Sequence, residues 1–175
     1  GASSHRALGF ECFSLEGYCW PLSARPGERI DFFLSTRQPS RVLVTFERLT
    51  MIRGELLAEP TGRAVTVTVD HQPTAPAAWS EGCGWRRLFT LPVPRHWTSG
   101  LYAATCTSET GHSCRVVFVV KPHMDVHAPL LMLANVNTWS AYNVWGGGSN
   151  YTWVSIDKRL SFLRPNPPAA LWSRA

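Results

Sequence analysis

The chain has 175 residues, of which 45% are hydrophobic and 17% charged, and its formal net charge is +5. This length suits one domain, or one domain with part of a second. The hydrophobic fraction and eight tryptophans exclude an intrinsically disordered chain. No apolar stretch approaches the ~20 residues of a membrane-spanning helix. The basic residues are mostly arginines scattered singly, unlike the clustered charge of a nucleic-acid-binding surface. We therefore expect neither a membrane nor a nucleic-acid partner.

The first two-thirds of the chain alternates apolar and polar residues with the period of half-buried β-strands. Turn signals separate the alternating runs, and long amphipathic helical windows are absent from this region. The predicted strands lie at residues 10–15, 30–35, 42–47, 65–70, 85–93, 100–107 and 114–121. About seven short strands are typical of a β-sandwich of the immunoglobulin or fibronectin-III type. We assign this domain to residues 1–121.

Residues 71–84 interrupt the alternation with two prolines, several alanines and a tryptophan. This composition predicts an ordered surface loop between the sheets. Such a loop either caps the sandwich or carries function, as long loops on sandwiches often do.

The five cysteines form no CxxC pair and no cysteine and histidine array with zinc spacing. Cys106 and Cys114 flank the hairpin predicted around residues 109–112 and would lie opposite each other, within reach of a cross-strand disulfide. The odd number of cysteines and the lack of a leader pattern instead favour reduced thiols packed in the core. On this basis we expect a cytoplasmic protein.

The character of the sequence changes after Lys121. Residues 122–129 are typical of a linker, and Leu130–Ala134 is a continuous apolar run of the kind that is buried on both faces of a parallel sheet. In α/β proteins, ligands bind beyond the carboxyl end of such strands. We therefore expect residues 122–175 to form a linker, a buried strand and the ligand-binding loop of an incomplete α/β domain.

The loop that follows the apolar run is rich in amide and aromatic side chains. Tyr142, Asn137 and Asn143 could converge on one ligand, or could hydrogen-bond the loop to its own backbone. Gly146–Gly148 lacks the Lys-Ser/Thr of a phosphate loop, so it predicts a sharp turn or a close approach to a ligand. There is no nucleophile elbow and no evident pair of carboxylates. The residues alone therefore show no self-contained hydrolytic site.

Residues 137–151 read NTWSAYNVWGGGSNY and resemble the signature NTWxAYNxWGGxSxY of the N,N-dimethylformamidase large-subunit family. Shorter similarities lie upstream and downstream of this signature. They are GY at 17–18, RPGERIDF at 25–32, HWTSGLYA at 96–103, VFVV at 117–120 and SFLRP at 161–165. The resemblance covers roughly residues 17–165, and its specific part is the stretch 139–147.

The resemblance implies a sandwich followed by an α/β domain of glutamine-amidotransferase-like fold. It implies hydrolysis of the C–N bond of small formamides at an iron ion held by two tyrosines and a glutamate. Tyrosinate and carboxylate are hard ligands that suit such a Lewis acid. Tyr142 matches one ligand, Asn166 stands where the family has its second tyrosine, and the glutamate would lie beyond residue 175. The residues of the loop that we expect to bind the substrate are Asn137, Trp139, Asn143 and Trp145.

Two functions of different classes follow from the sequence. The first is part of an amidohydrolase that acts on a small amide, holds iron through Tyr142, and is inactive as this chain alone. In that case the chain is a fragment or a shortened relative, and further chain, another subunit or a second copy completes the α/β domain. The second function is that of a non-catalytic β-sandwich module that binds a partner or a sugar through its tryptophan-rich loops.

Overall fold

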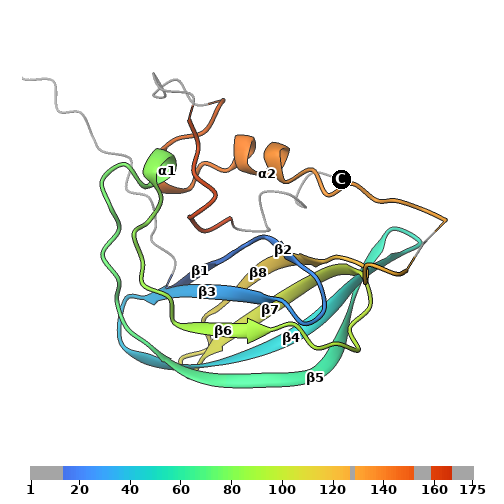
Figure 1. Ribbon diagram of the computed structural model, residues 1–175. Coiled ribbons are helices and arrows are strands. Elements are labelled where there is room, and N and C mark those ends of the chain that lie inside the picture. The colour runs from blue at the N-terminus through green and yellow to red at the C-terminus, as the bar shows by residue number, and fades with distance from the viewer. Residues whose placement is uncertain (1–13, 127–128, 152–158, 167–175) are drawn as a thin grey trace, which may run out of the picture.

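The computed structural model describes residues 14–126, 129–151 and 159–166, and this part of the chain is mainly β (Figure 1). The strands are β1 (Leu15–Trp20), β2 (Ser23–Ala24), β3 (Arg29–Thr36), β4 (Ser40–Ile52), β5 (Glu55–Val69), β6 (Phe89–Pro92), β7 (Gly100–Ser108) and β8 (Ser113–Val120). The helices are α1 (Ala78–Glu81), α2 (Val136–Tyr142) and the 3-10 turn η1 (Trp145–Gly147). Among the described residues, no helix has the length and apolar character to cross a membrane.

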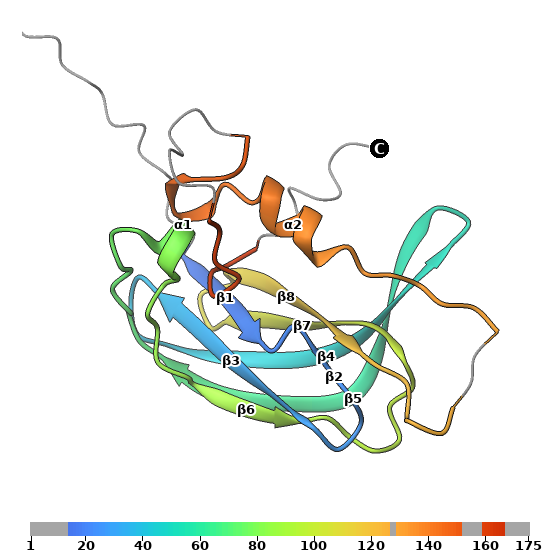
Figure 2. The same cartoon turned by 45° about the horizontal axis from the view of Figure 1, so that its top comes forward.

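The strands form two sheets that lie against each other (Figure 2). The smaller sheet has the order β1-β3-β6 and the larger one the order β2-β8-β7-β4-β5. Neighbouring strands are antiparallel except for the short parallel pairing of β2 with β8. The prediction of a mainly β protein is therefore confirmed, with two packed sheets.

The inward-facing side chains of both sheets meet in one core. Phe32 of β3 stacks on Phe89 of β6, with ring centroids 4.8 Å apart. The same ring meets Phe46 of β4 and Phe118 of β8 edge-on, each at 5.9 Å. Since Phe32, Phe46 and Phe118 are all buried, these contacts show how the period-2 alternation unites the two sheets.

Most of the predicted strands are present. The runs at 30–35, 100–107 and 114–121 correspond to β3, β7 and β8, whereas those at 42–47 and 65–70 are parts of the longer strands β4 and β5. The predicted β7–β8 hairpin places Cys106 directly opposite Cys114. The cysteines of the described residues are free thiols, as the sequence favoured.

Two strand predictions need correction. The prediction at 85–93 is wrong in extent, because only Phe89–Pro92 pairs with β3. Gly84 has a φ of +72°, and the Arg86 amide donates to the Gln72 side chain, so the backbone before residue 89 is held as a loop. The prediction at 10–15 falls mostly on residues 1–13, which lie outside the described residues, and the first described strand begins at Leu15.

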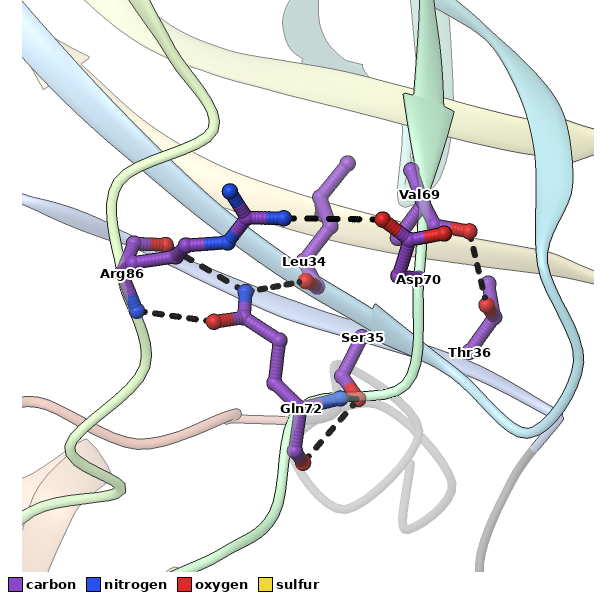
Figure 3. A network of polar contacts seen from close by, with 7 residues as sticks. All are labelled: Leu34, Ser35, Thr36, Val69, Asp70, Gln72 and Arg86. Carbon is purple, nitrogen blue, oxygen red and sulfur yellow. Dashed lines mark hydrogen bonds and ion pairs between the residues drawn. The ribbon is translucent and has the colours of Figure 1, made fainter.

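Side-chain hydrogen bonds fix the base of the loop 71–84 on β3, as Figure 3 shows. The Gln72 amide accepts a hydrogen bond from the Arg86 amide and donates to the Leu34 carbonyl, each at 2.8 Å. The Gln72 backbone N–H donates to Ser35 Oγ at 2.9 Å, and Arg86 forms an ion pair with Asp70 at 3.5 Å. Both ends of the loop are thereby anchored to the smaller sheet, and α1 is carried between them.

The buried strand predicted at Leu130–Ala134 is not formed. Its four large side chains are between 76% and 96% exposed, and the backbone has no strand conformation. No strand of the described residues pairs with the run, and its apolar side chains face solvent instead of a parallel sheet. The domain boundary predicted between residues 121 and 122 stays a prediction.

Candidate functional site

The signature segment, residues 135–151 and 159–166, lies above β1 and β8 at one edge of the sandwich, beside α1 (Figures 1 and 2). Residues of this segment set where the helix α2 begins and ends. Asn135 caps α2, since its side-chain oxygen accepts a hydrogen bond from the Thr138 amide at 3.3 Å. The helix ends at Asn143, whose extended backbone turns the chain into η1.

The glycine triplet makes the sharp turn that the sequence predicted. Gly146 and Gly147 have φ values of +80° and +96°, which favour glycine. Gly148 packs against the indole of Trp79 so closely that a Cβ atom would lie 2.8 Å from the ring. The triplet therefore seats the signature segment on α1, and in this structure its close approach is to a protein side chain.

Arg164 is the hydrogen-bonding centre of the signature segment. Its side chain is buried and donates to the carbonyls of Ser161 (3.0 Å), Trp145 (2.7 Å), Gly148 (2.9 Å) and Ser140 (3.1 Å). Burial lowers the pKa of the guanidinium to about 10, so it stays charged at neutral pH. Sequence reasoning missed this role, and the only signal was the place of Arg164 in the SFLRP motif.

Asn143 holds the loop together. Its side chain is buried, and Nδ2 donates to the Pro165 carbonyl at 2.8 Å while Oδ1 accepts from the Trp145 amide at 3.0 Å. The structure thus realises the alternative in which this amide hydrogen-bonds to the backbone. The prediction that Asn143 binds a ligand is untested, but its amide is engaged in these contacts.

Trp145 joins the signature segment to the smaller sheet. Its Nε1 donates to Glu16 Oε1 at 2.8 Å, and its ring meets Trp85 edge-on at 5.9 Å. Tyr18 and Cys83 belong to the same cluster. Burial raises the pKa of Tyr18 and that of Cys83, the latter to about 12, so both groups stay protonated at neutral pH.

A small pocket opens between β1 and β8 on one side and the signature segment on the other. Its volume of about 50 Å³ suits a ligand of only a few heavy atoms. The walls are mostly apolar and include Leu22, Val116, Trp139 and Phe162. Asn166 also lines it. Of the predicted binding residues, Trp139 and Asn143 reach the pocket, whereas Asn137 is exposed and Trp145 packs beneath the loop.

Tyr142 lies at the end of α2 and is stacked on Tyr151. The ring centroids are 4.3 Å apart and the planes differ by 17°. Both side chains face solvent, with exposed fractions of 53% and 64%. Interaction with the Tyr142 side chain raises the pKa of Tyr151. The signature segment therefore presents two stacked phenol side chains to solvent.

The donor atoms of this pair fit iron in chemistry, because phenolate oxygens are hard anionic ligands. They supply two ligands, and within the described ranges no group of three histidine, cysteine, aspartate or glutamate residues could hold a metal ion. Asn166, which the resemblance predicts to stand at the position of the second family tyrosine, is a neutral amide in the pocket wall. A third anionic ligand would come from outside the described residues.

Comparison with sequence families assigns the chain. A model of the family "N,N-dimethylformamidase beta subunit-like, C-terminal" matches residues 54–173, more than half of the chain and the whole signature. The chain belongs to this family. The resemblance predicted from the signature is thereby confirmed, and with it a dimethylformamidase-related class of protein.

No curated protein matches the chain. Among solved structures, the sporulation control protein Spo0M of Bacillus subtilis is similar with 8% sequence identity and a TM-score of 0.33. That match covers 65% of this dimethylformamidase-related chain and 49% of Spo0M, so it spans about half of the length of that protein.

Proposed function

We propose that this chain is the sandwich-containing part of an amidohydrolase that cleaves the C–N bond of a small amide. Membership of the dimethylformamidase-related family supports the class of reaction. The observation that carries the proposal is the stacked pair of Tyr142 and Tyr151 at the exposed end of the signature segment, with ring centroids 4.3 Å apart. We assign both phenol oxygens as iron ligands.

The stacking of the two rings supports a shared metal ion. Two nearly parallel phenol side chains with centroids 4.3 Å apart would offer both oxygens to one ion. Bound iron would polarise the amide carbonyl and activate a water molecule. Tyr151 would then serve in place of the second family tyrosine, whose position Asn166 occupies here.

The backbone of the signature segment holds the tyrosine pair in register. The Asn150 amide donates to the Ala141 carbonyl at 3.1 Å. Because Tyr151 follows Asn150 and Tyr142 follows Ala141, this hydrogen bond brings the two tyrosines beside each other. Between these points the Gly146–Gly147 turn reverses the chain, and Arg164 fixes the carbonyls at both of its ends. In the proposed site these groups position the ligands and have no contact with the metal.

Four finer assignments belong to the same proposal. The two-sheet domain would be of immunoglobulin or fibronectin-III type, and further chain or another subunit would complete an α/β domain that covers Leu130–Leu133. The free thiols are consistent with the cytoplasm. The pocket beside Trp139, with its small volume and mostly apolar wall, suits a small amide.

Titration of the protein with ferric iron tests the tyrosine pair. Ferric tyrosinate absorbs visible light, so the wild-type protein should become coloured, and both Tyr142→Phe and Tyr151→Phe should lose most of the band. Tyr18→Phe removes a buried hydroxyl elsewhere and should keep it. A colourless wild-type protein would refute the iron site. A band that survives in Tyr151→Phe but not in Tyr142→Phe would remove Tyr151 from it.

The internal contacts of the loop favour a second candidate function, a non-catalytic β-sandwich binding module. Asn143 and Trp145, two of the predicted binding residues, are engaged in hydrogen bonds that hold the loop. Release of amine from a small formamide separates the two functions when it is measured on the iron-loaded protein together with the further chain or subunit that completes the α/β domain. Turnover by that assembly that disappears in Tyr142→Phe supports the enzyme, whereas iron binding by the assembly without turnover supports the module.

A further inference from the structure

Two cysteines face each other across the β7–β8 hairpin, away from the proposed iron site. Cys106 and Cys114 are direct partners in the antiparallel register. The Ser108 amide donates to the His112 carbonyl at 2.8 Å, so these two residues form a hydrogen-bonded pair. On each strand, Cys106 and Cys114 lie two residues further from the turn, so they also form a hydrogen-bonded pair. Such pairs place their Cα atoms ~5.5 Å apart, a separation that a disulfide spans.

Both thiols lie on the inner face of the larger sheet. On β7 the inward-facing side chains include Tyr102 and Cys106. On β8 they include Phe118, and Cys114 lies an even number of residues before it, so its side chain is on the same face of the strand. The Cys114 side chain is the largest cause of the raised pKa of Cys106, and the antiparallel register pairs the two residues directly. The two sulfur atoms are therefore neighbours, and neither strand has to shift its register to bring them together.

The cysteines differ in access to solvent. Cys106 is fully buried, and the Cys114 side chain and burial raise its pKa. Burial also raises the pKa of Cys19 and of Cys83 to about 12. Cys114 is the cysteine of the described residues that is partly exposed. A small oxidant therefore meets Cys114 first, and its nearest thiol is that of Cys106.

We propose that Cys106 and Cys114 form a reversible disulfide when the protein meets hydrogen peroxide. The Cys114 sulfur attacks the peroxide, so that an S–O bond forms, the O–O bond breaks and water leaves. The Cys106 sulfur then attacks the sulfenic sulfur, an S–S bond forms, and the hydroxyl departs as water with the Cys106 proton. The two thiols lose two electrons, which reduce the peroxide to two waters. A dithiol reductant restores both thiols by exchange.

The bridge would act on the centre of the larger sheet. β7 pairs with β4, and β8 pairs with β2, so a link between β7 and β8 restrains strands on both sides of it. Val116 and Val117 of β8 also line the pocket under Trp139. A disulfide constrains the unfolded chain, so oxidation should make the fold more stable.

Peroxide treatment of the folded protein, followed by thiol counting on the intact mass, tests the proposal. The expected result is the loss of two alkylatable thiols per chain together with the mass of two hydrogen atoms, and a linked peptide that contains Cys106 and Cys114. Dithiothreitol should restore both thiols. The midpoint of thermal unfolding should rise by several degrees in the oxidised protein.

Two serine variants identify the pair. Cys114→Ser should keep the Cys106 thiol reduced under the same treatment, whereas Cys83→Ser, at a buried cysteine in the separate cluster beside Trp85, should form the bridge as the wild type does. Oxidation of Cys114 to a sulfinic acid without a bridge would overturn the proposal. So would a linked peptide that joins Cys106 to Cys19 or to Cys12.

Discussion

The sandwich and the signature segment are held together by different forces. In the sandwich, apolar side chains from both sheets share one core around Phe32. In the signature segment, backbone carbonyls converge on Arg164, and Asn143 adds two further hydrogen bonds. The first arrangement is non-directional and spread over many residues, whereas the second depends on a few donors in fixed positions.

This difference has a consequence for the two tyrosines. Tyr142 and Tyr151 have exposed rings, so little apolar burial holds them in place. Their stacking depends on the backbone path between them, and that path depends on the hydrogen bonds of Arg164 and Asn143. A site of this kind can lose its geometry while the sandwich beneath it stays folded, because local opening can be much easier than global unfolding.

Replacement of Phe32 by alanine should have the largest effect, and it should be global. The variant loses the stack on Phe89 and the edge contacts with Phe46 and Phe118. Loss of a buried phenylalanine costs about 3–5 kcal/mol of unfolding free energy. Denaturant unfolding followed by circular dichroism measures it. A loss below ~1 kcal/mol would show that the two sheets do not depend on this contact.

Replacement of Arg164 by methionine should have the next largest effect, and it should be local. The carbonyls of Ser140, Trp145 and Gly148 lose their donor, and each buried unpaired group costs ~1–3 kcal/mol. Hydrogen exchange should speed up by about 100-fold or more in α2 and η1, with little change in β3 and β7.

The control for that variant is Arg86→Met, which removes an exposed arginine that is ion-paired with Asp70. Exposed pairs contribute ~0–1 kcal/mol, so exchange in the signature segment should be unchanged. Equal acceleration across β3 and α2 in Arg164→Met would mean that the two regions unfold as one unit. That outcome would remove the distinction between them.

The sandwich was predictable from sequence because burial leaves a repeating signal. Strands such as β3 alternate inward and outward side chains, and the turn residues at 109–112 mark the hairpin where the register pairs Cys106 with Cys114. The prediction at 85–93 failed because the Arg86 backbone amide donates a hydrogen bond to a distant side chain, that of Gln72, which holds Arg86 outside the sheet. No local pattern encodes such a contact.

The candidate site was predictable in its motif but not in its contacts. The signature identified the loop, the family and Tyr142. It did not show that Asn143 and Trp145 would be engaged within the protein, or that Tyr151 would stack on Tyr142. The apolar run at Leu130–Leu133 suggested burial, yet burial requires a neighbouring strand, which none of the described residues supplies there.

Replacement of Gly148 by alanine should have the smallest effect and should report on the contact between α1 and η1. The backbone of Gly148 suits any residue, but the new methyl group would lie 2.8 Å from the Trp79 ring. Overpacking of this kind costs ~1–3 kcal/mol. In a Trp79→Leu background the smaller side chain leaves room, so the same substitution should cost much less, and a double-mutant cycle measured by exchange in η1 should show that coupling. Equal costs in the two backgrounds would mean that the turn is set by Arg164 alone and does not depend on the loop that carries α1.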